Sequence, residues 1–311
     1  MFRGTPTALA NGLKTRDFTI KAGKTGHSVI VVQLTDLHIG ICNEKDLGNK
    51  TLAQTYAVRG WSKRPAVIQN ALRGLAYADS VKADQIMITG DALDYLSQGG
   101  LDWLKTNVWN RYPNGKALIS TGNHEFVQKM QGTVEEQDES VRQKLLDQWG
   151  NEIYYESRVL RNKVMVIQMD NGTGSFRNEQ VPLLRADLAL AREKGYTVLL
   201  FFHEPISTGN AKDRDVNASY AGTGAATSFN FYTGSTVANP FTDPDSTNGA
   251  IYRMIVNSAD VVGGVFCGHL HADYYTEIQA KPPDGQAKVI PQYVLTGTPY
   301  DKGHALKITV Q

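Results

Sequence analysis

The segment Ser28-Val-Ile-Val-Val-Gln-Leu-Thr-Asp-Leu-His38 joins an apolar run to two ionisable side chains. Residues 28–34 are mostly apolar and β-branched, which is typical of a strand that is buried on both faces. If the chain stays extended beyond this run, Asp36 and His38 point to the same side, because side chains alternate along a strand. The segment therefore predicts a buried strand followed by a carboxylate and an imidazole that can face one metal ion.

Further apolar runs alternate with helical patterns along the chain. We expect additional buried strands at residues 85–89, 116–120, 163–169, 197–202 and 261–266. Helices are expected to begin at Pro65, to cover residues 138–149, and to cover residues 178–194, where Gly195 provides the C-cap. This alternation indicates a layered α/β architecture with a largely parallel core, whose ligands bind at the carboxyl ends of the strands.

Length and composition favour a single domain over residues 1–311. Residues 207–247 are rich in Gly, Ser, Thr, Asn and Asp, and we predict an insertion or lid loop there, because such long loops in compact domains are usually functional or disordered. Lys and Arg together number 32 and Asp and Glu number 31. This near balance gives no sign of nucleic-acid or membrane binding.

The cysteines and the N-terminal segment bear on the compartment. Cys267 ends an apolar run and fits a buried thiol better than a disulfide or a thiolate metal site. The first residues lack the apolar core of a signal peptide, and no segment is apolar enough to span a membrane. The sequence as it stands predicts a cytoplasmic protein. A secreted form is the alternative if a leader was removed before this sequence begins. It does not indicate an oligomeric state.

Ionisable and amide side chains follow five of the predicted strands. They are Asp36, His38, Asp91, Asp94, Asn123, His124, His203, His269 and His271. Grouping uncompensated polar and charged groups costs several kcal/mol for each, and one or two bound cations would offset that cost. Carboxylate, imidazole and amide ligands without thiolates suit Mn, Fe, Zn or Co rather than Ca, and the residue types do not choose among the four.

These residues form five short motifs in a defined order within residues 29–271. The motifs are Asp36-x-His38, Gly90-Asp91-x-x-Asp94, Gly122-Asn123-His124-Glu125, His203 and Gly268-His269-x-His271. In this order, and each at a strand end, they resemble the signature of the calcineurin-like metallophosphoesterase superfamily. The resemblance implies a layered β-sandwich flanked by helices, with a dinuclear metal site at the carboxyl ends of the strands.

The resemblance also implies a role for each site residue. Asp36, His38 and His271 bind one metal ion, Asn123, His203 and His269 bind the other, and Asp91 bridges both. The two ions activate a shared water and clamp the phosphoryl oxygens. His124 stabilises the phosphate or protonates the departing oxygen, and Asp94 orients His124. Considered alone, Asp94 also fits a turn or helix-cap residue.

Two positions depart from the commonest superfamily pattern. Glu125 stands where Asp is frequent, and Tyr95 stands where an Arg often follows the second Asp of the Gly-Asp motif. The missing Arg makes phosphoprotein substrates less expected by analogy, and Asp36-x-His38 differs from the Asp-x-Gly of purple acid phosphatases. The implied activity is that of a phosphodiesterase acting on a small-molecule, nucleotide or lipid-like substrate. A phosphomonoesterase and a non-catalytic metal-binding scaffold are the alternatives.

Other enzyme classes fail on their own motifs. His203-Glu204 begins like the pair of a zinc peptidase, but residue 207 is Ser instead of His. The chain contains no Gly-x-Ser-x-Gly elbow, no Walker loop and no complete dinucleotide fingerprint. Retention of His124 and all the presumed ligands argues against a scaffold.

Loops set substrate choice on a rigid scaffold, and aromatic residues in two loops are candidates for substrate contact. They are Trp61, Phe229, Phe231 and Tyr232. These side chains could stack on a base or a sugar, or they could anchor their own loops.

Overall fold

The structure is a computed structural model that describes residues 10–23, 26–60, 64–126, 139–206, 246–280 and 285–311. Nearly all of the predicted loop at 207–247 lies outside these residues, as do Trp61, Phe229, Phe231 and Tyr232. Among the described residues, no helix is both long and apolar enough to cross a membrane.

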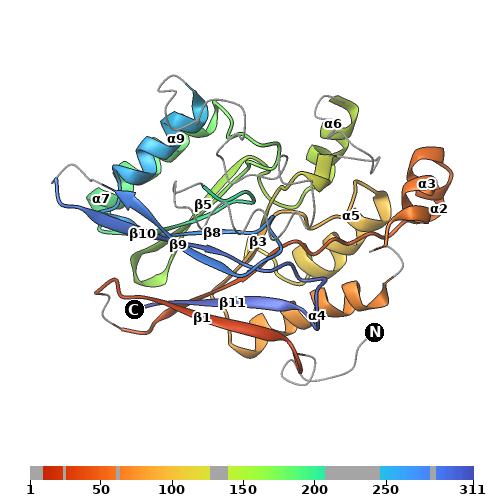
Figure 1. The fold of residues 1–311 in the computed structure, drawn as a ribbon, viewed down its shortest axis with the longest axis horizontal. Helices are drawn as coiled ribbons and strands as arrows, with labels where there is room; N and C mark the ends of the chain where they lie inside the picture. Colours follow the sequence, from red (N-terminus) through yellow and green to blue (C-terminus); the bar gives the residue numbers. More distant parts are fainter. Residues whose placement is uncertain (1–9, 24–25, 61–63, 127–138, 207–245, 281–284) are drawn as a thin grey trace.

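Two mixed β-sheets pack face to face as a sandwich (Figure 1). The first has the order β1 (Lys14–Ile20), β11 (His304–Val310), β2 (Val29–Leu34), β3 (Gln85–Thr89) and β4 (Ala117–Ser120). The second has the order β5 (Tyr155–Leu160), β6 (Val164–Met169), β7 (Thr197–Phe201), β8 (Val262–Cys267), β10 (Lys288–Val294) and β9 (Tyr274–Ala280). Strands β2, β3 and β4 are parallel, as are β6, β7 and β8, so several carboxyl ends share one edge of each sheet.

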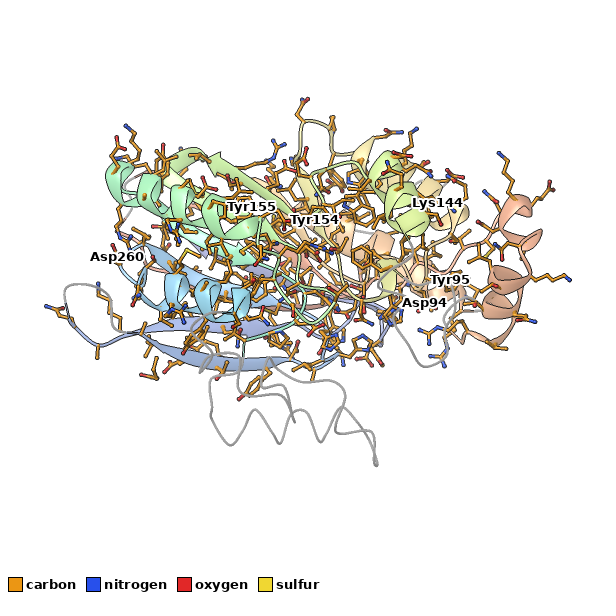
Figure 2. The ribbon with its side chains drawn as sticks, turned by 90° about the horizontal axis from the view of Figure 1, so that it is seen from above. Asp94, Tyr95, Lys144, Tyr154, Tyr155 and Asp260 are labelled. Atoms are coloured by element: carbon orange, nitrogen blue, oxygen red, sulfur yellow. The ribbon has the colours of Figure 1, made fainter. Side chains whose placement is uncertain are left out.

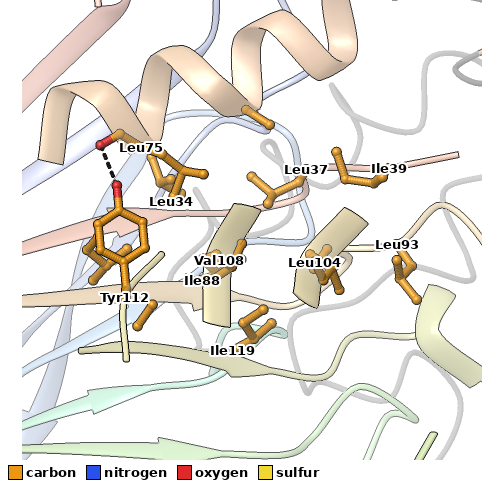
Figure 3. Packing of buried hydrophobic residues seen from close by; sticks show 14 of the residues in the cluster. Leu34, Leu37, Ile39, Leu75, Ile88, Leu93, Leu104, Val108, Tyr112 and Ile119 are labelled. Carbon is orange, nitrogen blue, oxygen red and sulfur yellow. Dashed lines mark hydrogen bonds between the residues drawn. The ribbon is translucent and has the colours of Figure 1, made fainter. Parts of the chain in front are cut away.

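Apolar side chains form three layers of core. Between the sheets, the buried rings of Phe201 and Phe266 stack with their centroids 5.1 Å apart. The outer face of the first sheet is covered by α4 (Pro65–Ser80) and α5 (Gln98–Leu104), and Figure 3 shows this packing around Leu34 and Ile88. There the hydroxyl of Tyr112 donates to the carbonyl of Leu75 at 3.1 Å. Helices α7 (Gln180–Lys194) and α9 (Thr247–Val256) cover the outer face of the second sheet.

The predicted α/β sandwich is confirmed, and the six predicted strands lie within one residue of their expected bounds. Three predicted helices are also present: α4 begins at Pro65, α6 covers Glu139–Gln148, and α7 ends before Gly195, whose φ of 66° is that of a left-handed cap. The sequence reading missed β1, β5, β9, β10 and β11. Of these, β1, β5 and β9 are edge strands. Strand β9, for example, alternates between buried and exposed positions and therefore shows no continuous apolar run.

Candidate metal centre

The candidate centre lies where strand ends of the two sheets meet. His203, just after β7, donates its Nδ1–H to the carbonyl of Thr89 at the end of β3, with 2.8 Å between the atoms. The main-chain N–H of His269, just after β8, donates to Oδ2 of Asp36 at 3.1 Å. Loops of the second sheet therefore hold their imidazoles against the carboxyl ends of the first sheet.

The backbone at these strand ends is strained. Five non-glycine residues have positive φ angles: Asp36 (49°), His38 (49°), Asp91 (47°), His269 (70°) and His271 (50°). Such conformations cost on the order of 1–3 kcal/mol each, and they persist where the surrounding structure enforces them, often at functional sites. The expected extended chain through residues 36–38 is therefore wrong. A turn after β2, rather than strand alternation, aims Asp36 and His38 at the same point.

Gly268 allows the close approach of the two sheets. A Cβ atom at this position would lie 1.8 Å from Oγ1 of Thr35 and 2.5 Å from Oδ2 of Asp36. We expect Gly268→Ala to lower the free energy of unfolding by about 1–3 kcal/mol or more, because overpacking forces neighbours to move. Thermal unfolding measures this change, with Gly60→Ala as the control, since a Cβ there has no neighbour within 4 Å. Equal melting temperatures for the two variants would contradict the prediction.

One donor cluster consists of Asp36, His38 and His271, whose ligand atoms all lie within 4.8 Å of one another. The Nε2 atoms of the two imidazoles are 3.1 Å apart, and Oδ1 of Asp36 is 3.0 Å from Nε2 of His271. The Nδ1 atoms point outward: that of His38 is 3.0 Å from Oδ1 of Asp94, and that of His271 is 2.9 Å from the hydroxyl of Tyr300. Contacts to Nδ1 leave both Nε2 atoms facing one point.

The second cluster consists of Asp91, His203 and His269, again within 4.8 Å. Nε2 of His203 is 3.3 Å from Oδ2 of Asp91 and 3.1 Å from Nδ1 of His269. Oδ2 of Asp91 also lies 4.0 Å from Nε2 of His38 in the first cluster. Asp91 therefore belongs to the second cluster and also faces an imidazole of the first.

Asn123 lies beside the second cluster in sequence and space. Its neighbour Gly122 is pressed against Asp91 and His203, and the main-chain N–H of His124 donates to Oδ1 of Asp91 at 3.0 Å. Among the described residues, the Asn123 Oδ1 atom is one of few buried side-chain oxygens without a hydrogen-bond partner. An unpartnered buried amide oxygen is costly, and a metal ion would satisfy it.

The buried carboxylates of the centre need positive charge nearby to compensate their negative charge. Burial lowers the pKa of His203, but the Asp91 and Asp36 carboxylates and the hydrogen bond to Thr89 together outweigh burial and raise this pKa to about 10. The pKa of His269 falls to about 3, because of burial and the charge on His203. Without metal, a proton on His203 thus compensates Asp91. Divalent cations supply the same compensation with more charge, and the Asp, His and Asn donors fit a dinuclear divalent site.

His124 and Asp94 lie at one side of the first cluster. The Nδ1–H of His124 donates to the main-chain carbonyl of Asp94 at 2.8 Å, whereas Oδ1 of Asp94 is 3.6 Å from this nitrogen. The main chain of Asp94, not its carboxylate, makes the close contact with His124. Nε2 of His124 is 3.7 Å from Oδ2 of Asp91, so the ring edge faces the space between the clusters.

Three residues near the centre were not assigned a role from the sequence. Tyr300 contacts His271 as described, and Arg59 donates to both carboxylate oxygens of Asp94. Burial raises the pKa of Asp94, but hydrogen bonds from Arg59 and His38 outweigh it and lower this pKa to about 2. Glu125 accepts the main-chain N–H groups of Asp91, Leu93 and Gly122, at 3.2, 2.9 and 2.6 Å. The short motif around Glu125 marked its position, but no local signal marked Arg59 or Tyr300.

A family model and two solved structures show what this chain is similar to. A family model described as calcineurin-like phosphoesterase matches residues 30–273. No curated protein matches the chain. A dimetal phosphatase from Danio rerio has a similar structure, with 12% identity, a TM-score of 0.44 and coverage of 89% of this chain and 90% of that chain. A putative 5'-nucleotidase from Staphylococcus aureus has 12% identity and a TM-score of 0.41, with coverage of 88% of this chain and 49% of that chain.

An α/β sandwich with clustered Asp, His and Asn donors at its strand ends fits a metal-dependent hydrolase. The chain belongs to the calcineurin-like phosphoesterase family, because the family model covers most of it. The expected superfamily and the expected phosphoric ester hydrolase class are therefore confirmed.

Proposed function

We propose that this centre hydrolyses phosphodiesters of a small-molecule, nucleotide or lipid-like kind, with two metal ions drawn from Mn, Fe, Zn and Co. The observation that carries the proposal is the position of Asp91, which belongs to one donor cluster, faces an imidazole of the other and lies 3.7 Å from the imidazole of His124. Asp36, His38 and His271 would hold one ion, Asn123, His203 and His269 would hold the other, and Asp91 would contact both. When bound, such ions turn water into a nucleophile at neutral pH and stabilise charge on the phosphoryl oxygens.

His124 supplies the proton-transfer part of this proposal. Its Nδ1–H is held by the carbonyl of Asp94, so Nε2 is the atom available to the substrate. The Nε2 atom lies 3.7 Å from Oδ2 of Asp91, and in its protonated form the ring can donate from Nε2 to a phosphoryl or departing oxygen. Glu125 keeps the loops of Asp91 and Gly122 together, so the distance between His124 and the clusters is set by buried main-chain hydrogen bonds.

Two features of the described residues near the centre favour a diester over a monoester. At neutral pH a phosphomonoester carries about two negative charges, whereas a diester carries one, so monoester recognition calls for more positive charge. The guanidinium of Arg59 is bonded to both oxygens of Asp94, and this pairing neutralises its charge. Position 95, where relatives often have an Arg, is a fully buried Tyr whose hydroxyl donates to the carbonyl of Gly40 at 3.0 Å.

Metal reconstitution tests this function. The purified protein is stripped with a chelator, Mn, Zn, Fe or Co is restored separately, and kcat/KM is compared for bis-p-nitrophenyl phosphate and p-nitrophenyl phosphate. We expect metal-dependent cleavage with the higher kcat/KM for the diester. A higher value for the monoester would identify a phosphomonoesterase instead. Metal binding without cleavage of either compound would favour the non-catalytic scaffold.

A further inference from the structure

Arg59 reaches the centre from a helical segment outside the family motifs. It is the C-cap of α3 (Lys50–Val58), which follows α2 (Glu44–Leu47) at one end of the molecule (Figure 1). Its Nε donates to Oδ2 of Asp94 at 2.8 Å, and its Nη2 donates to Oδ1. Figure 2 shows Asp94 on the side of the molecule where this segment lies. The guanidinium and the carboxylate therefore form a two-bond pair at the edge of the centre.

Asp94 is the point where several contacts of the centre combine. Its side chain is fully buried, whereas the side chain of Arg59 is 23% exposed. The Oδ1 atom that accepts from Arg59 also lies 3.0 Å from Nδ1 of His38, and the main-chain carbonyl of Asp94 accepts from Nδ1 of His124 at 2.8 Å. A rotation of the Asp94 side chain would disturb His38, and a shift of its main chain would move His124.

A guanidinium suits this position because of its shape. Two parallel N–H groups hold a carboxylate in one plane, whereas an ammonium group acts as a point charge and leaves the carboxylate free to rotate. A buried carboxylate is also costly unless it is paired and hydrogen-bonded. Arg59 therefore stabilises the charge of Asp94 and also sets the direction in which its lone pairs point.

The segment that carries Arg59 is itself held in place. Asn43 and Asp46 form a reciprocal cap at the start of α2. The Asp46 carboxylate also accepts the main-chain N–H groups of Gln98 and Gly99 at the start of α5, both at 2.8 Å. The chain leading to Arg59 is thus anchored to the same scaffold that follows Asp94 in sequence.

We infer that Arg59 is a positioning residue of this enzyme. It fixes the Asp94 carboxylate so that His38 presents its Nε2 atom to the metal site, and it steadies the residue whose main-chain carbonyl holds His124. The inference rests on the proposed function for its effect on turnover, and its effect on metal affinity is independent of that function. Arg59 thus supplies a positive charge near the centre that Tyr95 lacks. This charge holds the Asp94 carboxylate rather than the substrate.

Arg59→Gln and Arg59→Lys in the full chain test this role. For Arg59→Gln we expect metal affinity, measured by Mn titration of the stripped protein, to fall by about 10- to 100-fold, which is typical for loss of an outer contact. We expect kcat for bis-p-nitrophenyl phosphate to fall while KM stays within about twofold of that of the original protein. Guanidinium ion at millimolar concentration should restore part of both losses. Arg59→Lys keeps the charge without the planar pair, and an intermediate loss is expected.

The matched control is Arg192→Gln. Arg192 also makes a two-bond pair with an aspartate, Asp260, through contacts of 2.6 and 2.9 Å, and Figure 2 shows Asp260 at the opposite end of the molecule from Asp94. This variant should keep metal affinity and kcat. Circular dichroism confirms folding, and if Arg59→Gln does not fold, Arg59→Lys carries the same measurements.

Two results would overturn the inference. The first is that Arg59→Gln has the same metal affinity and kcat as Arg192→Gln, which would show that Asp94 does not need Arg59 to keep its position. A rise in KM with unchanged kcat and unchanged metal affinity would show that Arg59 binds substrate instead. If the original protein cleaves neither phosphate ester, the proposed function fails, and the metal titration still decides whether Arg59 positions Asp94.

Discussion

Replacing His124 with alanine is expected to lower kcat by about 10²- to 10⁴-fold, which is the usual contribution of a positioned general acid or base. The metal ions should remain bound, because His124 reaches the centre from its side and its closest side-chain contact is the carbonyl of Asp94. The ring belongs to neither of the two clusters described above, although it forms a third group of close donor atoms with His38 and Asp94. Metal content and kcat of the same preparation, measured together, separate these two effects.

The control for His124→Ala is the same replacement at another histidine. His27 is exposed and lies outside the strand-end motifs, so His27→Ala should keep both kcat and metal content. Undiminished activity in His124→Ala would remove this residue from the reaction. Loss of metal along with activity would show that His124 is a ligand rather than a proton donor.

Replacing Asp91 with alanine is expected to have the larger effect on metal binding. Asp91 belongs to the second cluster and lies 4.0 Å from Nε2 of His38 in the first, so its loss removes a donor from the second cluster and a negative charge beside the first. The decrease in metal affinity should exceed the roughly 10- to 100-fold that loss of an outer contact costs. Activity should fall to background at metal concentrations that saturate the original protein.

The metal-free protein provides a second measurement for this variant. Asp91 contributes most among the groups that raise the pKa of His203 to about 10 against the effect of burial, so its removal should lower this pKa and favour the neutral imidazole. Histidine NMR of the stripped protein at neutral pH should therefore show a protonated His203 in the original chain and a neutral one in Asp91→Ala. Asp79→Asn serves as the control, because Asp79 pairs with Arg111 away from the centre. Retention of metal affinity by Asp91→Ala would contradict its proposed place between the ions.

The fold was predictable to the extent that its strands are buried on both faces. Val29–Leu34 and Gln85–Thr89 are mostly apolar and almost entirely buried runs, and such runs are visible in a single sequence. Edge strands such as Tyr274–Ala280 expose every second side chain, so their pattern is weaker. Their place in a sheet depends on a partner strand that is found only after the chain has folded.

The candidate donors were predictable because each directly follows a buried strand. The order of Asp36, Asp91, Asn123, His203 and His269 along the chain, together with the parallel arrangement of their strands, was enough to group them. The local conformation was not predictable in the same way. Positive φ angles at Asp36 and His38 are unfavourable for the isolated segment, and only contacts with the rest of the molecule stabilise them.

The amino-acid sequence alone therefore determined the family, the α/β class and the set of candidate metal donors, because these depend on residue types and spacing within short segments. The tertiary structure decided which groups orient those donors. Tyr300 reaches His271 from a distant loop, and Arg59 pairs with a carboxylate 35 residues further along the chain. Contacts of this kind depend on how helices and loops pack against the sheets, and local sequence patterns do not encode them.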